Sequence, residues 1–253
     1  MTIYKKLFQK ILGHFGYKIT AVSQTGLSES ELVDPVFQRL YASYKAYTMT
    51  SPERMYALYQ SVKYVLDADI PGDIVECGVW KGGSSMIIAD TLHESDSNKK
   101  IFLYDTFEGM SEPTSKDIKA SNGHPAIEKW KTLTRADYTN WCYAPLDEVI
   151  INMQKTGYNQ NNIVYVKGKV EDTIPRTTPK AISLLRLDTD WYESSYHELQ
   201  HLFPLLSKGG VLILDDYGHW LGSREAVDTY FKEHDIKILL NRIDHTGRLG
   251  IKM

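Results

Sequence analysis

Short apolar runs and amphipathic stretches follow each other along the chain from about residue 50 onward. The apolar runs predict strands that are buried on both faces of a sheet, because such strands show no polar side. Between them, apolar residues recur every three or four positions, which predicts helices. The strands are expected at 73–77, 100–105, 163–166, 181–188 and 210–215, and the helices at 84–92, 191–203 and 223–233. This alternation predicts an α/β fold with a doubly wound, mostly parallel sheet of seven strands.

Two further apolar segments near the end of the chain complete this sheet. They lie near 236–241 and 249–253 and could pair antiparallel at one edge. Before the first strand, the pair Ser51-Pro52 has the residue types of a helix N-cap and first turn. We therefore expect a helix over 52–67 that leads into the sheet.

The first 48 residues are expected to form a helical arm in front of a main domain over 49–253. An apolar stripe with helical spacing runs through the start of this arm, among several lysines. It comprises Ile3, Leu7, Ile11 and Phe15, widened by Phe8 and Leu12. Such a helix could rest on an anionic membrane, but packing on its own domain or on a second subunit is favoured. We therefore expect a homo-oligomer, with the arm contacting substrate or the other subunit.

Composition narrows the class of protein. The chain has 253 residues, of which 42% are hydrophobic and 24% are charged, with a net charge of −3. This balance gives no support to nucleic acid as a partner, because phosphate-binding surfaces carry a basic excess. No apolar run approaches the roughly 18 residues that a transmembrane helix needs. The two cysteines, Cys77 and Cys142, form no metal-binding pair, so we expect reduced thiols and a cytoplasmic location.

A polar segment at about 108–152 interrupts the alternation of strands and helices. It contains several tryptophans and tyrosines and is long for a connection within an α/β sheet. Ligands of such sheets bind beyond the carboxyl ends of the strands, and this segment follows one of those ends. It could therefore fold over the binding crevice as a lid, or be a surface elaboration without a catalytic role.

A glycine-rich turn follows the first strand. Gly78, Gly82 and Gly83 precede the helix that begins at Ser84. Glycines allow a ligand to approach the backbone closely, and the helix start offers free N–H groups. The spacing departs from the G-x-G-x-x-G of dinucleotide-binding proteins, and the carboxylate of Glu76 would repel a pyrophosphate. The turn therefore favours a cationic, amino-acid-bearing ligand.

Acidic residues after the next two strands suggest the rest of a nucleoside site. Asp105 ends the second strand, where a carboxylate can accept hydrogen bonds from ribose hydroxyls. After the third strand, Gly168 is followed by Glu171 and Asp172. Either carboxylate could face an adenine edge, and the sequence does not choose between them.

Four carboxylates at the ends of two apolar strands are the most specific feature. Asp188 and Asp190 follow one strand, and Asp215 and Asp216 follow the next. Each aspartate alone could be a helix cap, but four at one sheet edge concentrate negative charge unless a cation neutralises it. Oxygen ligands without a cluster of His or Cys suit Mg²⁺ rather than Zn²⁺. The nearby His219 is more often a structural group than a ligand.

The chain resembles the TylF/MycF family of macrocin-type sugar O-methyltransferases from about Tyr47 to its end. The resemblance rests on the segments YTMTS (47–51), VECGVWKGGS (75–84), LYDTFEGM (103–110), LRLDTDWYES (185–194) and GGVLILDDYG (209–218). It implies a class I methyltransferase fold, S-adenosylmethionine as methyl donor and Mg²⁺ as activator. It also implies that Asp188, Asp215 and Asp216 bind the metal and that Asp190 is the general base.

The resemblance further implies which residues contact the cofactor. They are Tyr47, Met49, Glu76, Gly78, Ser84, Asp105, Gly168, Glu171, Asp172 and Asp188. Members of the family methylate sugar hydroxyls of glycosylated natural products. The acceptor is therefore expected to be a glycoside, a nucleotide sugar or a surface glycan.

Two functions from other classes compete with this hypothesis. A nicotinamide-dependent sugar oxidoreductase could use a similar sheet, although the absent G-x-G-x-x-G counts against it. A non-catalytic glycan-assembly protein could use the N-terminal helix, but it would have no use for four carboxylates at one edge. Binding of S-adenosylmethionine separates both from a methyltransferase.

Overall fold

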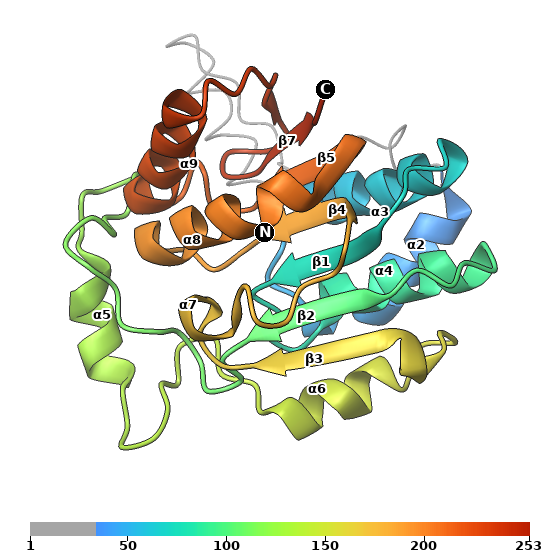
Figure 1. The fold of residues 1–253 in the computed structure, drawn as a ribbon. Helices are drawn as coiled ribbons and strands as arrows, with labels where there is room; N and C mark the ends of the chain where they lie inside the picture. Colours follow the sequence, from blue (N-terminus) through green and yellow to red (C-terminus); the bar gives the residue numbers. More distant parts are fainter. Residues whose placement is uncertain (1–33) are drawn as a thin grey trace, which may run out of the picture.

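The computed structural model describes residues 34–253, and within them a seven-stranded sheet forms the centre of the fold (Figure 1). The strand order is β3-β2-β1-β4-β5-β7-β6. Neighbours from β3 to β5 pair in parallel, whereas β7 pairs antiparallel with both β5 and β6. The strands are β1 Asp73–Cys77, β2 Ile101–Asp105, β3 Ile163–Lys167, β4 Ile182–Leu187, β5 Leu206–Leu214, β6 Asn241–Arg242 and β7 Arg248–Ile251. The predicted mostly parallel sheet with an antiparallel edge is confirmed.

Helices precede β1 and occupy most of the connections between the strands. They are α2 Pro35–Tyr44, α3 Pro52–Asp67, α4 Gly83–Glu94, α5 Ala126–Leu133, α6 Leu146–Met153, α7 Val170–Thr173, α8 Tyr192–Leu202 and α9 Leu221–Glu233. Short 3₁₀ turns lie at η2 Lys45–Tyr47, η3 Gln160–Asn162 and η4 Phe203–Leu205. The predicted helix over 52–67 and its cap are confirmed, since the Ser51 hydroxyl accepts a hydrogen bond from the Arg54 N–H at 3.2 Å.

Two predictions of local structure differ from what the fold contains. The penultimate strand was expected over 236–241 but is only the two-residue β6, because the segment before it leaves the sheet. Within the polar segment 108–152, the sequence analysis did not separate the helix α6. Its apolar residues Val149 and Met153 are buried in the core beside α4, so the end of this segment is an ordinary covering helix of the sheet.

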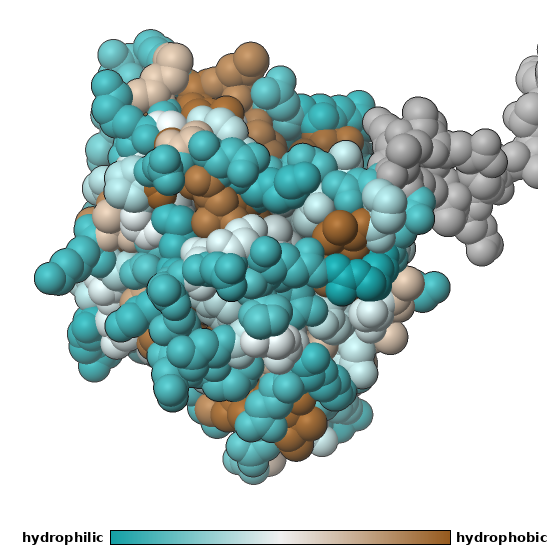
Figure 2. Space-filling model, turned by 90° about the vertical axis from the view of Figure 1, so that its right-hand side faces the viewer, coloured by the Kyte–Doolittle hydropathy of each residue, from teal (hydrophilic) through white to brown (hydrophobic). Residues whose placement is uncertain are grey.

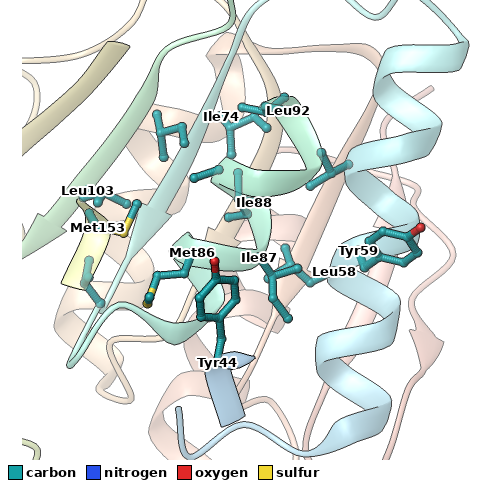
Figure 3. Packing of buried hydrophobic residues seen from close by; sticks show 14 of the residues in the cluster. Tyr44, Leu58, Tyr59, Ile74, Met86, Ile87, Ile88, Leu92, Leu103 and Met153 are labelled. Atoms are coloured by element: carbon teal, nitrogen blue, oxygen red, sulfur yellow. The ribbon is translucent and has the colours of Figure 1, made fainter. Parts of the chain in front are cut away.

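The sheet is covered on both faces, and alternate strand residues face opposite layers. Ile74 belongs to the hydrophobic cluster that α2, α3, α4 and α6 share with the sheet, and Val75 belongs to the cluster beneath α8 and α9. Figure 3 shows part of the first cluster, in which Ile88 and Leu92 of α4 lie beside Ile74 of β1. Both strand residues are fully buried, as expected for a doubly wound sheet.

The parallel strands end level with one another, which positions the candidate site. Cys77 of β1 pairs with Leu187 of β4, and Leu187 pairs with Leu214 of β5. The residues that follow are therefore neighbours: the Asp188 N–H donates to the Cys77 carbonyl at 2.8 Å, and the Asp215 N–H donates to the Leu187 carbonyl at 2.9 Å. In Figure 1 the arrowheads of β1, β2 and β3 point to the side of the molecule on which α5 and α7 lie.

The opposite side of the molecule has an ordinary hydrophilic surface. Figure 2 shows this face, in which hydrophobic residues form separate groups among hydrophilic ones.

Between residues 34 and 253, no helix combines the length and the apolar character needed to cross a bilayer. The predicted amphipathic helix near residues 3–15 lies outside the described residues, and the homo-oligomer stays a prediction.

Candidate active site

A cavity of about 640 Å³ opens at the carboxyl ends of the parallel strands. Its volume lies within the range of small-molecule sites in proteins. Residues from five strand ends line it, together with the segment 47–51, part of the insertion 108–152 and the turn at 245–246. Of the residues predicted from the sequence, it is lined by Tyr47, Met49, Gly78, Ser84, Asp105, Gly168, Glu171, Asp188, Asp190, Asp215 and Asp216.

Three carboxylates meet on the floor of the cavity. One oxygen from each of Asp188, Asp215 and Asp216 lies within 4.8 Å of the others. The second oxygen of Asp216 is buried and has no hydrogen-bond partner among the described residues. Burial raises the pKa of Asp188 and of Asp216 well above the ordinary value, and the neighbouring carboxylates add to the shift. A hard divalent cation fits these three carboxylates. It would bind the buried Asp216 oxygen that has no hydrogen-bond partner and would offset the repulsion between the neighbouring negative charges.

Arg186 fixes two of these carboxylates from inside the sheet. Its Nη2 lies 2.8 Å from an Asp188 oxygen and 2.7 Å from an Asp215 oxygen, while its Nη1 lies 2.6 Å from Glu76. The Arg186 side chain is only 2% exposed. The sequence analysis did not single it out, although a charged residue within an apolar strand signals a buried partner.

A second arginine reaches the same floor from helix α3. Arg54 forms an ion pair with the Asp215 oxygen that Arg186 leaves free, and its Nε lies 3.0 Å from Asp244. Asp244 also accepts hydrogen bonds from the Ser51 hydroxyl at 2.8 Å and from the Gly247 N–H at 2.7 Å. Although burial favours its neutral form, these donors lower the pKa of Asp244 to about 2. No sequence pattern indicated Arg54, because its partners lie far along the chain.

Asp190 stands at the edge of the carboxylate group in a sparsely populated backbone conformation. Its φ of 71° lies in the left-handed region that non-glycine residues rarely adopt. Burial raises the pKa of Asp190 to about 7, and the charges of Asp188 and Asp215 contribute to the rise. A carboxylate with a raised pKa beside the cavity can accept a proton near neutral pH.

Glycines bring the cofactor end of the cavity together. Gly78 has a φ of 85°, and a Cβ there would meet the Asp188 carbonyl oxygen at 2.1 Å. A Cβ on Gly83 would meet the Tyr47 backbone at 2.7 Å, so the segment 47–51 packs directly on the glycine-rich turn. The predicted residues Ser84, Tyr47 and Met49 therefore line one end of the cavity.

Asp105 lies where the sequence predicted it, but its oxygens already have backbone partners. One oxygen accepts hydrogen bonds from the N–H groups of Val79 at 2.7 Å and Trp80 at 3.0 Å. The other accepts from the Phe107 N–H at 2.8 Å. Burial raises the pKa of Asp105, although these hydrogen bonds oppose the rise. The carboxylate thus holds two loops of the cavity in place.

Two predicted cofactor residues lie away from the cavity lining. Glu76 is fully buried, and its carboxylate is held by Arg186 and by the Ser85 hydroxyl. Asp172 is exposed on helix α7, and of the two alternatives after β3 it is Glu171 that lines the cavity.

The insertion supplies the wall opposite the strand ends. Trp141 packs against Trp191 and Trp220 with ring centroids 5.6 and 6.0 Å apart, and the Trp191 indole donates to the Ser111 carbonyl at 3.0 Å. The fully buried Asp117 accepts a hydrogen bond from the Tyr192 N–H at 2.8 Å. These contacts attach the insertion to the starts of α8 and α9. Cavity-lining residues that the sequence analysis missed here are Lys119, His124, Lys129, Trp141 and Trp220.

Comparisons with known proteins agree on one family. The family model of macrocin-O-methyltransferase (TylF) matches residues 40–249. The chain is 32% identical over 248 residues, covering 97% of this chain and 90% of the relative, to the 8-demethyl-8-(2,3-dimethoxy-α-L-rhamnosyl)-tetracenomycin-C 4′-O-methyltransferase of Streptomyces olivaceus. It is 30% identical over 203 residues, covering 80% of this chain and 77% of the relative, to the mycinamicin III 3″-O-methyltransferase of Micromonospora griseorubida. The solved structure of the O-methyltransferase NovP has a TM-score of 0.72 at 26% identity, with 82% of each chain covered.

Proposed function

Because the chain belongs to the macrocin-O-methyltransferase (TylF) family and is therefore an O-methyltransferase, we propose that it methylates a sugar hydroxyl with S-adenosylmethionine and Mg²⁺. The acceptor is a sugar of a glycosylated small molecule or a nucleotide sugar. The relative from Streptomyces olivaceus bears the name of a rhamnosyl compound, which supports a sugar as acceptor. The observation that carries the proposal is the meeting of three carboxylates beside Asp190 on the cavity floor.

Asp188, Asp215 and Asp216 would hold the cation. A divalent cation there supplies a Lewis acid that orients the acceptor hydroxyl and lowers its pKa. Arg186 and Arg54 keep the carboxylate of Asp215 in place before any cation arrives, because each pairs with one of its oxygens. The ligand set is therefore preorganised by buried ion pairs rather than by the cation itself.

Asp190 is the proposed general base. As the acceptor oxygen forms its bond to the methyl carbon, the bond from that carbon to sulfur breaks and the hydroxyl proton passes to the Asp190 carboxylate. The reacting atoms must lie in line, so the cavity walls contribute through positioning. The left-handed backbone of Asp190 turns the chain between β4 and α8, which keeps its carboxylate beside the floor.

The other end of the cavity would bind the donor. Gly78, which follows β1, and Ser84 in the first turn of α4 leave room for the amino-acid part. Asp105 ends β2 and Glu171 follows β3, the two strands that would flank the nucleoside. Tyr47 and Met49 would cover it from the segment packed on Gly83. The proposal leaves out Glu76 and Asp172, because neither lines the cavity. The insertion would act as the lid that excludes water.

Methyl transfer from labelled S-adenosylmethionine to a panel of rhamnosides and nucleotide sugars tests this proposal. We expect EDTA to abolish transfer and Mg²⁺ to restore it. Asp190→Asn should lower turnover by about 10²–10⁴-fold while binding of S-adenosylmethionine and Mn²⁺ persists. Asp235→Asn is the matched control, because its side chain is 86% exposed and remote in the fold from these strand ends. Full activity without metal, or near-normal turnover of Asp190→Asn, would contradict the assigned roles.

A further inference from the structure

Besides Arg54 and Lys169, five residues that can carry positive charge line the cavity. Lys119, His124 and Lys129 come from the insertion, His219 follows β5, and His245 lies in the turn before β7. We call this set the cationic wall. His124, Lys129 and His245 are exposed, and Lys119 and His219 are half-buried, so the wall extends from the mouth inward.

Backbone hydrogen bonds fix the cationic wall beside the metal ligands. The Lys119 N–H donates to the His124 carbonyl at 2.9 Å, which closes a tight turn. The next residue, Ala120, donates to the His219 carbonyl at 2.8 Å, and the His219 N–H donates to the Asp216 carbonyl at 2.9 Å. Lys119, His124 and His219 are therefore connected through the backbone to the proposed metal ligand Asp216.

The two lysines of the wall lack acidic partners. Among residues 34–253, neither Lys119 nor Lys129 forms an ion pair, whereas Lys116 in the same insertion pairs with Glu225 at 2.9 Å. The Lys129 ammonium lies 3.9 Å from the centroid of the Trp141 ring instead. Both lysines line the cavity without an acidic partner among the described residues, an arrangement that an anionic ligand would stabilise.

Within residues 34–253, the aspartates of the floor form no ion pair with the lysines of this wall. Asp215 is paired with Arg54 and Arg186, and Asp188 is paired with Arg186. The proposed cation would offset part of the remaining charge, which comes from Asp190 and Asp216. The acceptor end of the cavity thus has two zones. The carboxylates of the floor would act on the reacting hydroxyl, and the lysines of the cationic wall carry positive charge without an acidic partner.

From this division we propose that the acceptor is an anionic sugar that carries a phosphate or diphosphate. The phosphate groups bind the cationic wall, with Lys119 and Lys129 as the principal contacts, while the reacting hydroxyl points to the floor. This inference rests on the proposed methyltransferase function and narrows its acceptor class. Lysine binds phosphate as a point charge, and two lysines match the charge of a diphosphate. A nucleotide sugar and a simple sugar phosphate share this chemistry.

Binding of phosphate compounds to the full chain in EDTA tests the wall without a metal bridge. Calorimetric titration would use inorganic diphosphate, uridine diphosphate glucose and the neutral nucleoside uridine. We expect both phosphate compounds to bind at least about tenfold more tightly than uridine, with affinity falling as salt rises. Tighter binding of uridine diphosphate glucose than of diphosphate assigns a nucleotide sugar, and equal binding assigns a sugar phosphate.

Two charge-removing variants and one control locate the binding. Lys119→Met and Lys129→Met should each raise the Kd for diphosphate about tenfold. Lys208→Met is the control, because Lys208 is an exposed lysine near the opposite end of β5 and should leave the Kd unchanged. Circular dichroism of each variant checks that the fold persists.

The outcomes separate this inference from the proposed function. No binding of diphosphate, or equal Kd values for wild type and both lysine variants, would overturn the anionic acceptor. If S-adenosylmethionine and Mn²⁺ still bind in that case and neutral rhamnosides are methylated, the proposed function stands alone. If diphosphate binds at the wall but S-adenosylmethionine does not bind, the proposed function fails instead.

Discussion

Arg186 and Glu76 are paired inside the sheet, with Nη1 of the arginine 2.6 Å from the glutamate carboxylate. They sit opposite each other in the register of β4 and β1, and both side chains are almost completely buried. The Nη2 of the same guanidinium pairs with Asp188 and with Asp215. One buried arginine therefore connects the core of the sheet to the proposed metal ligands.

Replacing this arginine should destabilise the fold and disturb the site. Arg186→Met leaves Glu76 as an unpaired buried carboxylate, which we expect to lower the free energy of unfolding by about 3–5 kcal/mol. Urea denaturation measures the change. The control is Arg224→Met, since Arg224 and its partner Asp228 are 57% and 54% exposed, and a change within about 0.5 kcal/mol is expected there. Equal losses in the two variants would show that the buried pair carries no special weight.

The proposed metal ligands Asp216 and Asp215 should respond differently to loss of charge. In EDTA at pH 7, Asp216→Asn should be at least as stable as the wild type, because Asp216 is crowded by like charges and one of its oxygens has no hydrogen-bond partner among the described residues. Asp215→Asn should be less stable, because Arg54 and Arg186 each lose one of their charged partners. Both variants should bind Mn²⁺ at least about tenfold more weakly. Urea midpoints and Mn²⁺ titration measure these effects, and a marked loss of stability in Asp216→Asn would argue against the charge crowding.

Gly78 is expected to tolerate no side chain. Gly78→Ala places a Cβ 2.1 Å from the Asp188 carbonyl oxygen and keeps an unfavourable φ of 85°. Gly123→Ala isolates the backbone effect, because Gly123 has a φ of 73° and nothing within 4 Å of the added carbon. The control should cost about 1 kcal/mol, and Gly78→Ala clearly more, with weakened Mn²⁺ binding at the displaced Asp188. Similar thermal midpoints for the two variants would show that the ends of β1 and β4 can move apart at little cost to make room for the Cβ at position 78.

The stability of the fold should depend on pH through Asp244. Its folded pKa of about 2 lies below the value of about 3.9 for an unfolded aspartate, so the ionised form stabilises the fold. The contribution, roughly 2 kcal/mol, is fully present above about pH 4 and is lost as the pH falls through about 2. Asp244→Asn should therefore be less stable at pH 7 and lose less stability on acidification. Urea denaturation at a series of pH values measures the free energy of unfolding, and an equal loss in the two proteins between pH 7 and pH 2 would contradict this.

Local sequence patterns were sufficient to predict most of the strands and helices, and also the meeting of aspartates at one edge of the sheet. The strand Asp73–Cys77 and the helix Pro52–Asp67 follow directly from apolar spacing and a Ser-Pro start. Parallel strands end at one edge, so acids after two of them had to come close. The strand β6 was predicted too long, and the helix α6 was missed, because eight residues in a polar segment carry too little periodicity.

Other parts of the site depend on partners that lie far apart in the sequence. Glu76 resembled a ligand-binding acid, but the register of β1 and β4 sets it opposite Arg186, so its charge is satisfied inside the core. Arg54 reaches Asp215 only because α3 packs against the sheet. The cationic wall likewise forms only when the insertion pairs with the segment after β5.

The sequence by itself determined the order of the elements, the glycine-rich turn and the acids at the strand ends, because these depend on neighbours within a few residues. Only the tertiary structure decided which charges are paired and which face the cavity. Pairing depends on strand register and helix packing, which join residues more than a hundred positions apart, such as Glu76 and Arg186. It left Asp216 with a free buried oxygen and Lys119 without an ion pair among the described residues, and these unsatisfied groups point to the ligands.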